Sequence, residues 1–140
     1  MSAISAIEET SFTDPYPRYF LSQLAEANPD TFLVALINDR IVGYAVVDNW
    51  IDQQRLVSIA VGTGLRRRGI GQALLNGMYM RLREGALGLE VRKSNSGAIE
   101  FYLKNGFSQT GMSHSYYANG EDAVQMVKII RRKVEIATPA

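Results

Sequence analysis

The stretch IAVGTGLRRRGIGQALL, residues 59–75, joins an apolar run to an amphipathic pattern through a turn with four glycines and three consecutive arginines. This order predicts a strand, a turn and the start of a helix. N–H groups at a helix start carry partial positive charge, glycines let a ligand approach the backbone, and arginines donate charge-assisted hydrogen bonds to phosphate. The stretch therefore predicts a site for a diphosphate, with a solvated basic turn as the alternative.

Two common phosphate-binding motifs do not fit this turn. The Walker A pattern requires Gly-Lys-Ser/Thr after a glycine and four further residues, and no such run occurs. The dinucleotide fingerprint G-x-G-x-x-G fails because its third glycine position is Leu74 when counted from Gly69, and Arg67 when counted from Gly62. The spacing thus excludes both nucleotide-binding patterns.

The composition narrows the class of protein. The chain has 140 residues and a mean hydropathy of −0.07, which is typical of one globular domain. A formal net charge of +1 argues against a dedicated nucleic-acid-binding protein. The absence of cysteine excludes a disulfide framework, a thiolate metal site and a cysteine nucleophile. With no membrane-spanning run and no signal-peptide pattern at the start, we expect a cytoplasmic protein.

Periodicity and turn residues predict a mixed α/β architecture. The expected helices are 2–12, 19–27, 70–84 and 95–104, and the expected strands are 31–37, 41–50, 55–61, 86–92, 107–117 and 122–130. In strand 86–92, Leu87, Leu89 and Val91 share one face and Glu90 lies on the other. This element order favours a single mixed sheet with helices on its faces.

Several stretches carry a family resemblance. Arg66–Gly71 resembles the acetyl-coenzyme A signature Q/R-x-x-G-x-G/A of the GNAT acetyltransferases. LEVRKSNSGAIEFYLKNGF (89–107) is similar to the strand–helix segment of the RimI-like ribosomal-protein alanine acetyltransferases and the archaeal N-terminal acetyltransferases. SYYANGEDAVQMV (115–127) resembles their closing hairpin, and SFTDPYPRYF (11–20) resembles their substrate loop.

The resemblance implies the GNAT acyl-CoA N-acyltransferase fold, a mixed central β-sheet flanked by helices. It implies a single domain over residues 1–133, followed by a tail (134–140) that we expect to be disordered. The family usually begins with a strand, whereas this sequence begins at the following helix, so we expect the first strand to be missing, truly or through a late assigned start. The family often has proline at position 63 and glycine at position 67, where this sequence has Thr63 and Arg67.

The resemblance also implies a co-substrate, acetyl-CoA, and no metal. The residues implied in binding it are Ile59, Ala60, Val61, Arg66, Arg67, Arg68, Gly69, Ile70, Gly71, Gln72, Ala73, Asn95 and Tyr102. The amides of residues 59–61 would hold the thioester carbonyl if the strand separates from its neighbour there, as family members do at a β-bulge. Asn95 can serve as a helix cap at the same time.

Glu90 and Tyr102 are the implied catalytic pair, as general base and general acid. Taken from the residues alone, a solvated or salt-bridged strand carboxylate is the favoured interpretation of Glu90, and a packed aromatic is that of Tyr102; the resemblance reverses this preference. An α-amino group titrates near pH ~7.7–8.0, so an N-terminal substrate needs only a mild base. Without cysteine, direct attack in a ternary complex is favoured over an acyl-enzyme.

The expected function is N-α-acetylation, with protein or peptide N-termini as partners and a ribosomal protein as one candidate target. The implied substrate-binding residues are Asp14, Tyr16, Pro17, Tyr116 and Tyr117, whose alternative interpretation is turn residues and edge-strand aromatics. We expect no membrane or nucleic-acid partner, and a monomer or homodimer. Acetylation of lysine side chains or small amines, or a non-catalytic acetyl-CoA-binding subunit, are the alternatives.

Overall fold

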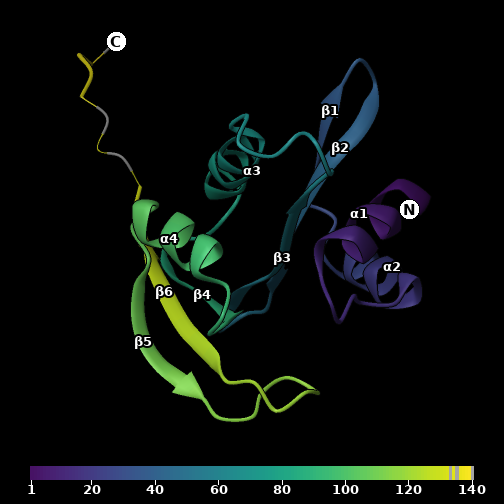
Figure 1. Cartoon of the computed structure of the whole chain (residues 1–140). Coiled ribbons are helices and arrows are strands. Elements are labelled where there is room, and N and C mark those ends of the chain that lie inside the picture. The colour runs from purple at the N-terminus through teal and green to yellow at the C-terminus, as the bar shows by residue number, and fades with distance from the viewer. Residues whose placement is uncertain (133, 135, 140) are drawn as a thin grey trace.

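A computed structural model describes residues 1–132, 134 and 136–139. The elements in chain order are α1 (Ser2–Ser11), α2 (Arg18–Ala27), β1 (Phe32–Ile37), β2 (Arg40–Asn49), β3 (Gln54–Val61), α3 (Ile70–Tyr79), β4 (Gly85–Arg92), α4 (Ser96–Lys104), β5 (Ser108–Ser113) and β6 (Ala123–Ile130). The predicted mixed α/β class is confirmed. Figure 1 shows α3 and α4 on one side of the sheet and α1 and α2 on the other.

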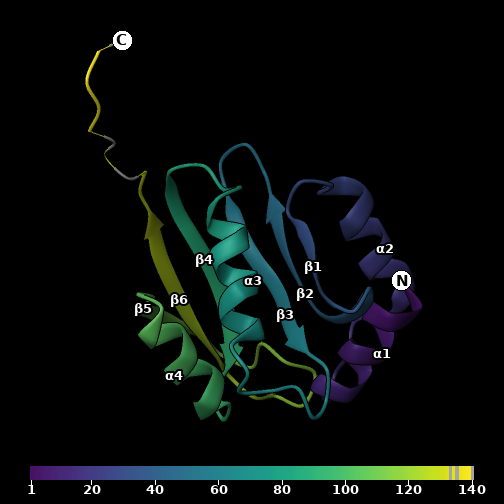
Figure 2. The same ribbon diagram turned by 90° about the horizontal axis from the view of Figure 1, so that it is seen from above.

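The sheet has the strand order β1-β2-β3-β4-β6-β5. Neighbouring strands are antiparallel except β3 and β4, which are parallel and pair only at Gln54–Leu87 and Arg55–Gly88. No later residue of β3 pairs with β4 in the described part of the chain, so the two strands separate toward their carboxyl ends. In Figure 2, α3 lies across the middle of this sheet. The separation creates the space in which the site is built.

Two apolar cores lie on the two faces of the sheet. Under α3 and α4, the fully buried Leu75, Met78 and Leu82 pack against β4 and β6. Under α1 and α2, Leu21 and Tyr44 anchor a second cluster. β4 alternates as its sequence predicts: Leu87, Leu89 and Val91 are buried, while the residues between them are more exposed. This alternation turns Glu90 toward the opposite face of the sheet.

The third helix is shorter than its periodicity predicts. α3 ends at Tyr79 instead of residue 84, and the N–H of Arg81 donates to the Met78 carbonyl over 2.9 Å in a tight closing turn. This turn leaves Met80 in solvent and directs Leu82 into the core. The apolar residue at position 82 therefore belongs to the turn after the helix, although its spacing fits the helix itself.

β3 contains a bulge at Val57. Val46 pairs with Ser58 and Val47 pairs with Leu56, so Val57 is an extra residue opposite β2. Leu56 packs into the α3–α4 core, whereas Val57 packs against the α1–α2 cluster and Ser58 bonds with Tyr44 on that same side. The bulge thus lies two residues before the expected position at 59–61, and it places two successive side chains on the α1 face.

The structure describes only part of the C-terminal segment about which the sequence makes predictions. Lys133, the last residue of the expected domain, and Glu135 and Ala140 of the expected tail lie outside the described residues. Val134 and residues 136–139 form no helix or strand. Among the helices of the described residues, none has the length and apolar character needed to cross a membrane. The end of the domain at residue 133 stays a prediction.

Candidate active site

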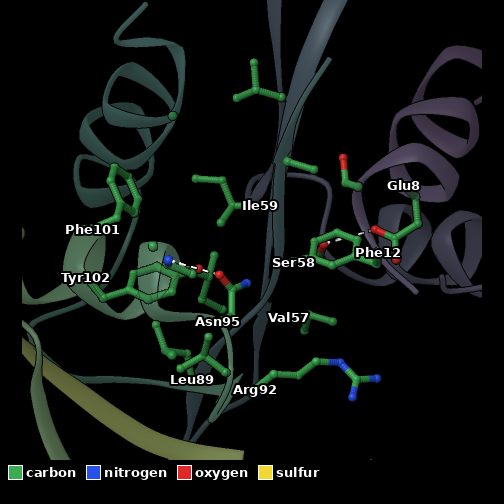
Figure 3. A pocket seen from close by; sticks show the side chains of 18 of the residues that line it. Glu8, Phe12, Val57, Ser58, Ile59, Leu89, Arg92, Asn95, Phe101 and Tyr102 are labelled. Carbon is green, nitrogen blue, oxygen red and sulfur yellow. Dashed lines mark hydrogen bonds between the residues drawn. The ribbon is translucent and has the colours of Figure 1, made fainter. Parts of the chain in front are cut away.

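A cavity of about 790 Å³ opens where β3 and β4 separate. Its walls come from α1 and the loop after it, from β3 and the turn into α3, from β4 and the start of α4, and from the segment between β5 and β6. A volume in this range suits a small-molecule ligand, and the carboxyl ends of parallel strands are where open α/β sheets bind ligands. Figure 3 shows its central part, with Tyr102 and Asn95 on one side of β3 and Glu8 and Phe12 on the other.

One end of the cavity is the glycine–arginine turn. Gly69 caps α3 in the left-handed region at φ 79°, a conformation that costs a residue with a Cβ atom, and the first N–H groups of α3 follow it. Gly71 also lines the cavity, so the backbone is accessible to a ligand. The partial positive charge of this helix start makes the turn an anion-binding end.

The three arginines of the turn differ in position. Arg66 and Arg67 line the cavity, and Arg66 is held by hydrogen bonds to Ser11 Oγ at 3.2 Å and to the Val61 carbonyl at 3.4 Å. Arg68 lines a neighbouring depression with Arg40 instead. Ala73 also lies outside the cavity lining. The other residues predicted to bind the co-substrate all line the cavity: Ile59, Ala60, Val61, Gly69, Ile70, Gly71, Gln72, Asn95 and Tyr102.

Arg67 adopts a left-handed backbone conformation. Its φ is 65°, a region that favours glycine because a Cβ atom crowds the following carbonyl. Glycine, which the family resemblance leads us to expect at this position, adopts this conformation without such a clash. The departure noted in the sequence is therefore a locally strained residue that also supplies a positive charge to the cavity.

Tyr102 lies at the centre of the cavity on α4. Its ring makes edge contacts with Phe101 and Phe107, at 5.5 and 5.4 Å between ring centres, which fix its orientation. Burial, with a smaller contribution from Tyr117, raises the pKa of Tyr102 well above its ordinary value of 10.0. The phenol therefore keeps its proton at neutral pH. Nearby, Asn95 caps α4 by accepting the Ala98 N–H at 3.1 Å (Figure 3).

Glu90 lines the same cavity from β4, and it is ion-paired. Its Oε2 accepts a hydrogen bond from Arg55 Nε at 2.7 Å, and the Arg55 guanidinium also contacts the Tyr116 hydroxyl. Arg55 is the last β3 residue that pairs with β4, so it crosses the gap where the strands begin to part. Glu90 is therefore salt-bridged and also faces the cavity, and its role as a general base stays a prediction.

The other end of the cavity is framed by two loops. Asp14 and Tyr16 line it from the loop between α1 and α2, and Tyr116 and Tyr117 line it from the segment between β5 and β6. Pro17 lies outside the lining, because it is the N-cap residue of α2. Burial, with a contribution from Tyr116, raises the pKa of Tyr117 to about 12. Four of the five predicted substrate-binding residues are therefore brought together.

Three charged residues of the cavity were not singled out by the sequence: Glu8, Arg55 and Arg92. Glu8 is only 1% exposed, and its carboxylate accepts hydrogen bonds from the hydroxyls of Tyr44 and Ser58 and from the Tyr16 N–H at 2.9 Å. One signal was present, because Glu8 follows Ile4 by one helical turn on the buried face of α1. Arg55 and Arg92 had no such local signal, because their partners lie far away in the sequence.

The chemistry of the cavity follows from these groups. It combines an anion-attracting helix start, a carboxylate that can accept a proton and a phenol that can donate one. In the part of the chain that the structure describes, no group of three or more His, Cys, Asp or Glu side chains is arranged to hold a metal ion. The arrangement can bind a phosphorylated ligand at one end and move a proton at its centre.

Comparison with known proteins gives consistent relatives. The sequence profile of the acetyltransferase (GNAT) family matches residues 1–107. A protein named N-alpha-acetyltransferase from Sulfurisphaera tokodaii is 34% identical over 139 residues, which cover 88% of this chain and 83% of that protein. The match therefore spans most of both chains.

Solved structures agree with the sequence relatives. Ard1 from Thermoplasma volcanium superposes with a TM-score of 0.87 at 29% identity, covering 94% of this chain and 91% of its own. The ribosomal-protein-S18-alanine N-acetyltransferase from Escherichia coli gives a TM-score of 0.80 at 30% identity, covering 98% and 92%. An acetyltransferase from Elizabethkingia anophelis with acetyl-CoA bound shares the fold, at 21% identity and a TM-score of 0.68 over 81% and 83% of the two chains.

Proposed function

This chain belongs to the acetyltransferase (GNAT) family, and we propose that within it the protein is an N-α-acetyltransferase. It transfers the acetyl group of acetyl-CoA to the N-terminal amine of a protein or peptide. The observation that carries the proposal is the single cavity that joins an anion-binding helix start, Tyr102 with Glu90, and a space framed by two loops. The names of the relatives from S. tokodaii and E. coli support the same activity.

Acetyl-CoA, the co-substrate, occupies the end of the cavity at the α3 start. The first N–H groups of α3 and the guanidinium groups of Arg66 and Arg67 bind its diphosphate. Its pantetheine arm runs toward Asn95, along the edge of β3 that has no strand partner beyond Arg55 among the described residues. Free N–H groups on that edge hold the thioester carbonyl oxygen.

The peptide enters from the loop end, and its neutral α-amine attacks the carbonyl carbon of the thioester. The new C–N bond forms, the C–S bond breaks, and the proton of the amine passes to Glu90, directly or through water. Tyr102 donates its proton to the leaving sulfur, for which it is suited because its phenol is protonated at neutral pH. The chain has no cysteine, so the acetyl group passes to the amine without a cysteinyl intermediate.

A peptide-library assay tests the proposal. The protein and acetyl-CoA are incubated with peptides whose N-termini are free or blocked and whose lysines are present or absent, and the products are located by mass spectrometry. Acetyl groups confined to free N-termini support N-α-acetylation. Acetylation of blocked, lysine-containing peptides would assign a lysine acetyltransferase, and binding of acetyl-CoA without any turnover would assign a non-catalytic subunit.

The wider setting belongs to the same proposal. We include in it a cytoplasmic location, a monomeric or homodimeric state and a target among ribosomal proteins. The name of the E. coli relative, which refers to ribosomal protein S18, supports the last of these. Including N-terminal peptides of ribosomal proteins in the library tests it, since a preference for them over unrelated N-termini is the expected result.

A further inference from the structure

Arg92 lies between the two loops that frame the peptide end. It is the last residue of β4, and its side chain is 18% exposed. Its guanidinium contacts the Asp14 carboxylate in the α1–α2 loop and donates to Glu121 Oε1 at 3.0 Å and to Asn119 Oδ1 at 3.2 Å in the β5–β6 segment. Figure 3 shows the extended Arg92 side chain running below Val57 in this view.

The same guanidinium also packs on an aromatic ring of the groove. Its central carbon lies 3.9 Å from the centre of the Tyr117 ring, which is within the range of a cation–π contact. Tyr117 in turn makes an edge contact with Tyr116 at 5.0 Å. One side chain thus touches a carboxylate of the first loop and a carboxylate, an amide and an aromatic ring of the second.

Apart from their contacts with Arg92, the two loops are held by different hydrogen bonds. In the first loop, Asp14 has no other hydrogen-bond or ion-pair partner among the described residues, and the Tyr16 N–H is held by Glu8. In the second, Glu121 also accepts the Ser94 N–H at 2.9 Å. Hydrogen bonding from Ser94 and from Arg92 holds the pKa of Glu121 below its ordinary value, so this carboxylate stays ionised.

We propose that Arg92 is a positioning residue that holds both loops at the spacing a peptide N-terminus requires. The proposal rests on the proposed function for its substrate. A planar guanidinium suits this task because its fork can serve two carboxylates at once, which a lysine ammonium does less well. One positive charge faces two negative ones, so Arg92 is not a free cation for an acidic substrate. Loops ordered in advance lower the entropy cost of peptide binding.

Three substitutions and a matched control test this role. Arg92→Met keeps the aliphatic stem and removes the guanidinium, Asp14→Asn and Glu121→Gln each remove one carboxylate, and Glu100→Gln removes the exposed Glu100–Lys104 pair on α4 as a control. Hydrogen–deuterium exchange is measured on both loops. We expect Arg92→Met to accelerate exchange in residues 12–17 and 115–122, Asp14→Asn only in the first loop, and Glu121→Gln only in the second.

Kinetics supply the second readout. We expect Arg92→Met to raise KM for the peptide about tenfold, because loops that are not ordered in advance must be ordered when the peptide binds, and to leave the calorimetric Kd for acetyl-CoA at the control value. Faster exchange in one loop alone, or an equal loss of acetyl-CoA affinity, would overturn the proposal. If Arg92→Met does not fold, Arg92→Lys takes its place, with a smaller change expected in both loops. A wild-type protein that acetylates no peptide would refute the proposed function, whereas the exchange pattern still decides on Arg92.

Discussion

The two ends of the cavity are built in opposite ways. At the proposed acetyl-CoA end, the groups that we propose bind the diphosphate come from one continuous stretch, the turn and helix start that contain Arg66, Arg67 and Gly69. At the peptide end, the groups come from four separate segments, and ion pairs join different elements there, Arg55 with Glu90 and Arg92 with Asp14. Among the described residues, Arg66 and Arg67 at the first end form no ion pair, whereas the second end is held together by internal ion pairs.

The two ends differ in how strongly they can select between ligands. A diphosphate is the same in every reaction of this family, so a local and rigid anion site is sufficient. Protein N-termini differ in their side chains, and a groove assembled from loops can change shape through a few contacts. Substitutions at the acetyl-CoA end should therefore change Kd for acetyl-CoA, and those at the peptide end should change KM for the peptide or the stability of the fold.

The largest expected effect belongs to neither end but to the centre. Tyr102→Phe removes the proton donor and keeps the ring contacts, so we expect kcat to fall about 100-fold or more. The Kd for acetyl-CoA should stay within about twofold of the wild type, as measured by calorimetry. Unchanged steady-state rates would remove Tyr102 from the mechanism.

The raised pKa of Tyr102 gives this variant a second readout. Because the folded-state pKa lies above the ordinary value of 10.0, the stabilisation from the neutral phenol is fully present below pH 10 and is lost as the pH rises above it. Urea unfolding at about pH 9 and about pH 10.5 should show a steeper loss of stability in the wild type than in Tyr102→Phe. Equal slopes would contradict the burial of an ionisable phenol.

At the peptide end, Glu8→Gln should destabilise the fold. The carboxylate is buried and accepts three hydrogen bonds, whereas an amide has one acceptor oxygen and brings two donors of its own. We expect the free energy of unfolding to fall by about 2 kcal/mol, measured by urea denaturation. The neighbouring Glu9 is exposed, and Glu9→Gln serves as the control with no change expected.

At the acetyl-CoA end, the loss of acetyl-CoA affinity on replacing an arginine should depend on the position of that arginine. Arg66→Ala should raise the calorimetric Kd for acetyl-CoA about tenfold, because Arg66 lines the cavity and is held in place by Ser11. Arg68→Ala should have a smaller effect, since Arg68 lies in the neighbouring depression. A larger effect from Arg68 than from Arg66 would reverse the assignment of the diphosphate contact.

The smallest expected effect is the relief of strain in the same turn. Arg67→Gly should raise the free energy of unfolding by up to about 1 kcal/mol, because glycine adopts the left-handed conformation without a Cβ clash. Arg68→Gly, at a position without positive φ, is the control and should not stabilise the protein. Thermal denaturation of both variants measures the difference, and equal Tm changes would argue against strain at Arg67.

Much of the acetyl-CoA end could be predicted because its signals are local. Glycine and arginine spacing, the change of period at Gly69 and the alternation in β4 all act over a few residues. The bulge at Val57 could not be placed, because it exists only relative to the partner strand and RLVSIAV carries no residue that marks it. The early end of α3 could not be predicted for a similar reason, because Leu82 fits the helical period but is buried by the turn after the helix.

Local backbone preference in the sequence was therefore sufficient for the fold class and the glycine–arginine turn, and the family resemblance was sufficient to predict that Glu90 and Tyr102 line one cavity. The pairing of side chains around that site became visible only in the folded chain. Glu8 with Tyr44, Arg55 with Glu90, and Arg92 with both loops are contacts between distant segments. The sequence does not show which residue a charged side chain pairs with. The partners are brought together only in the folded chain, around the point where β3 and β4 separate.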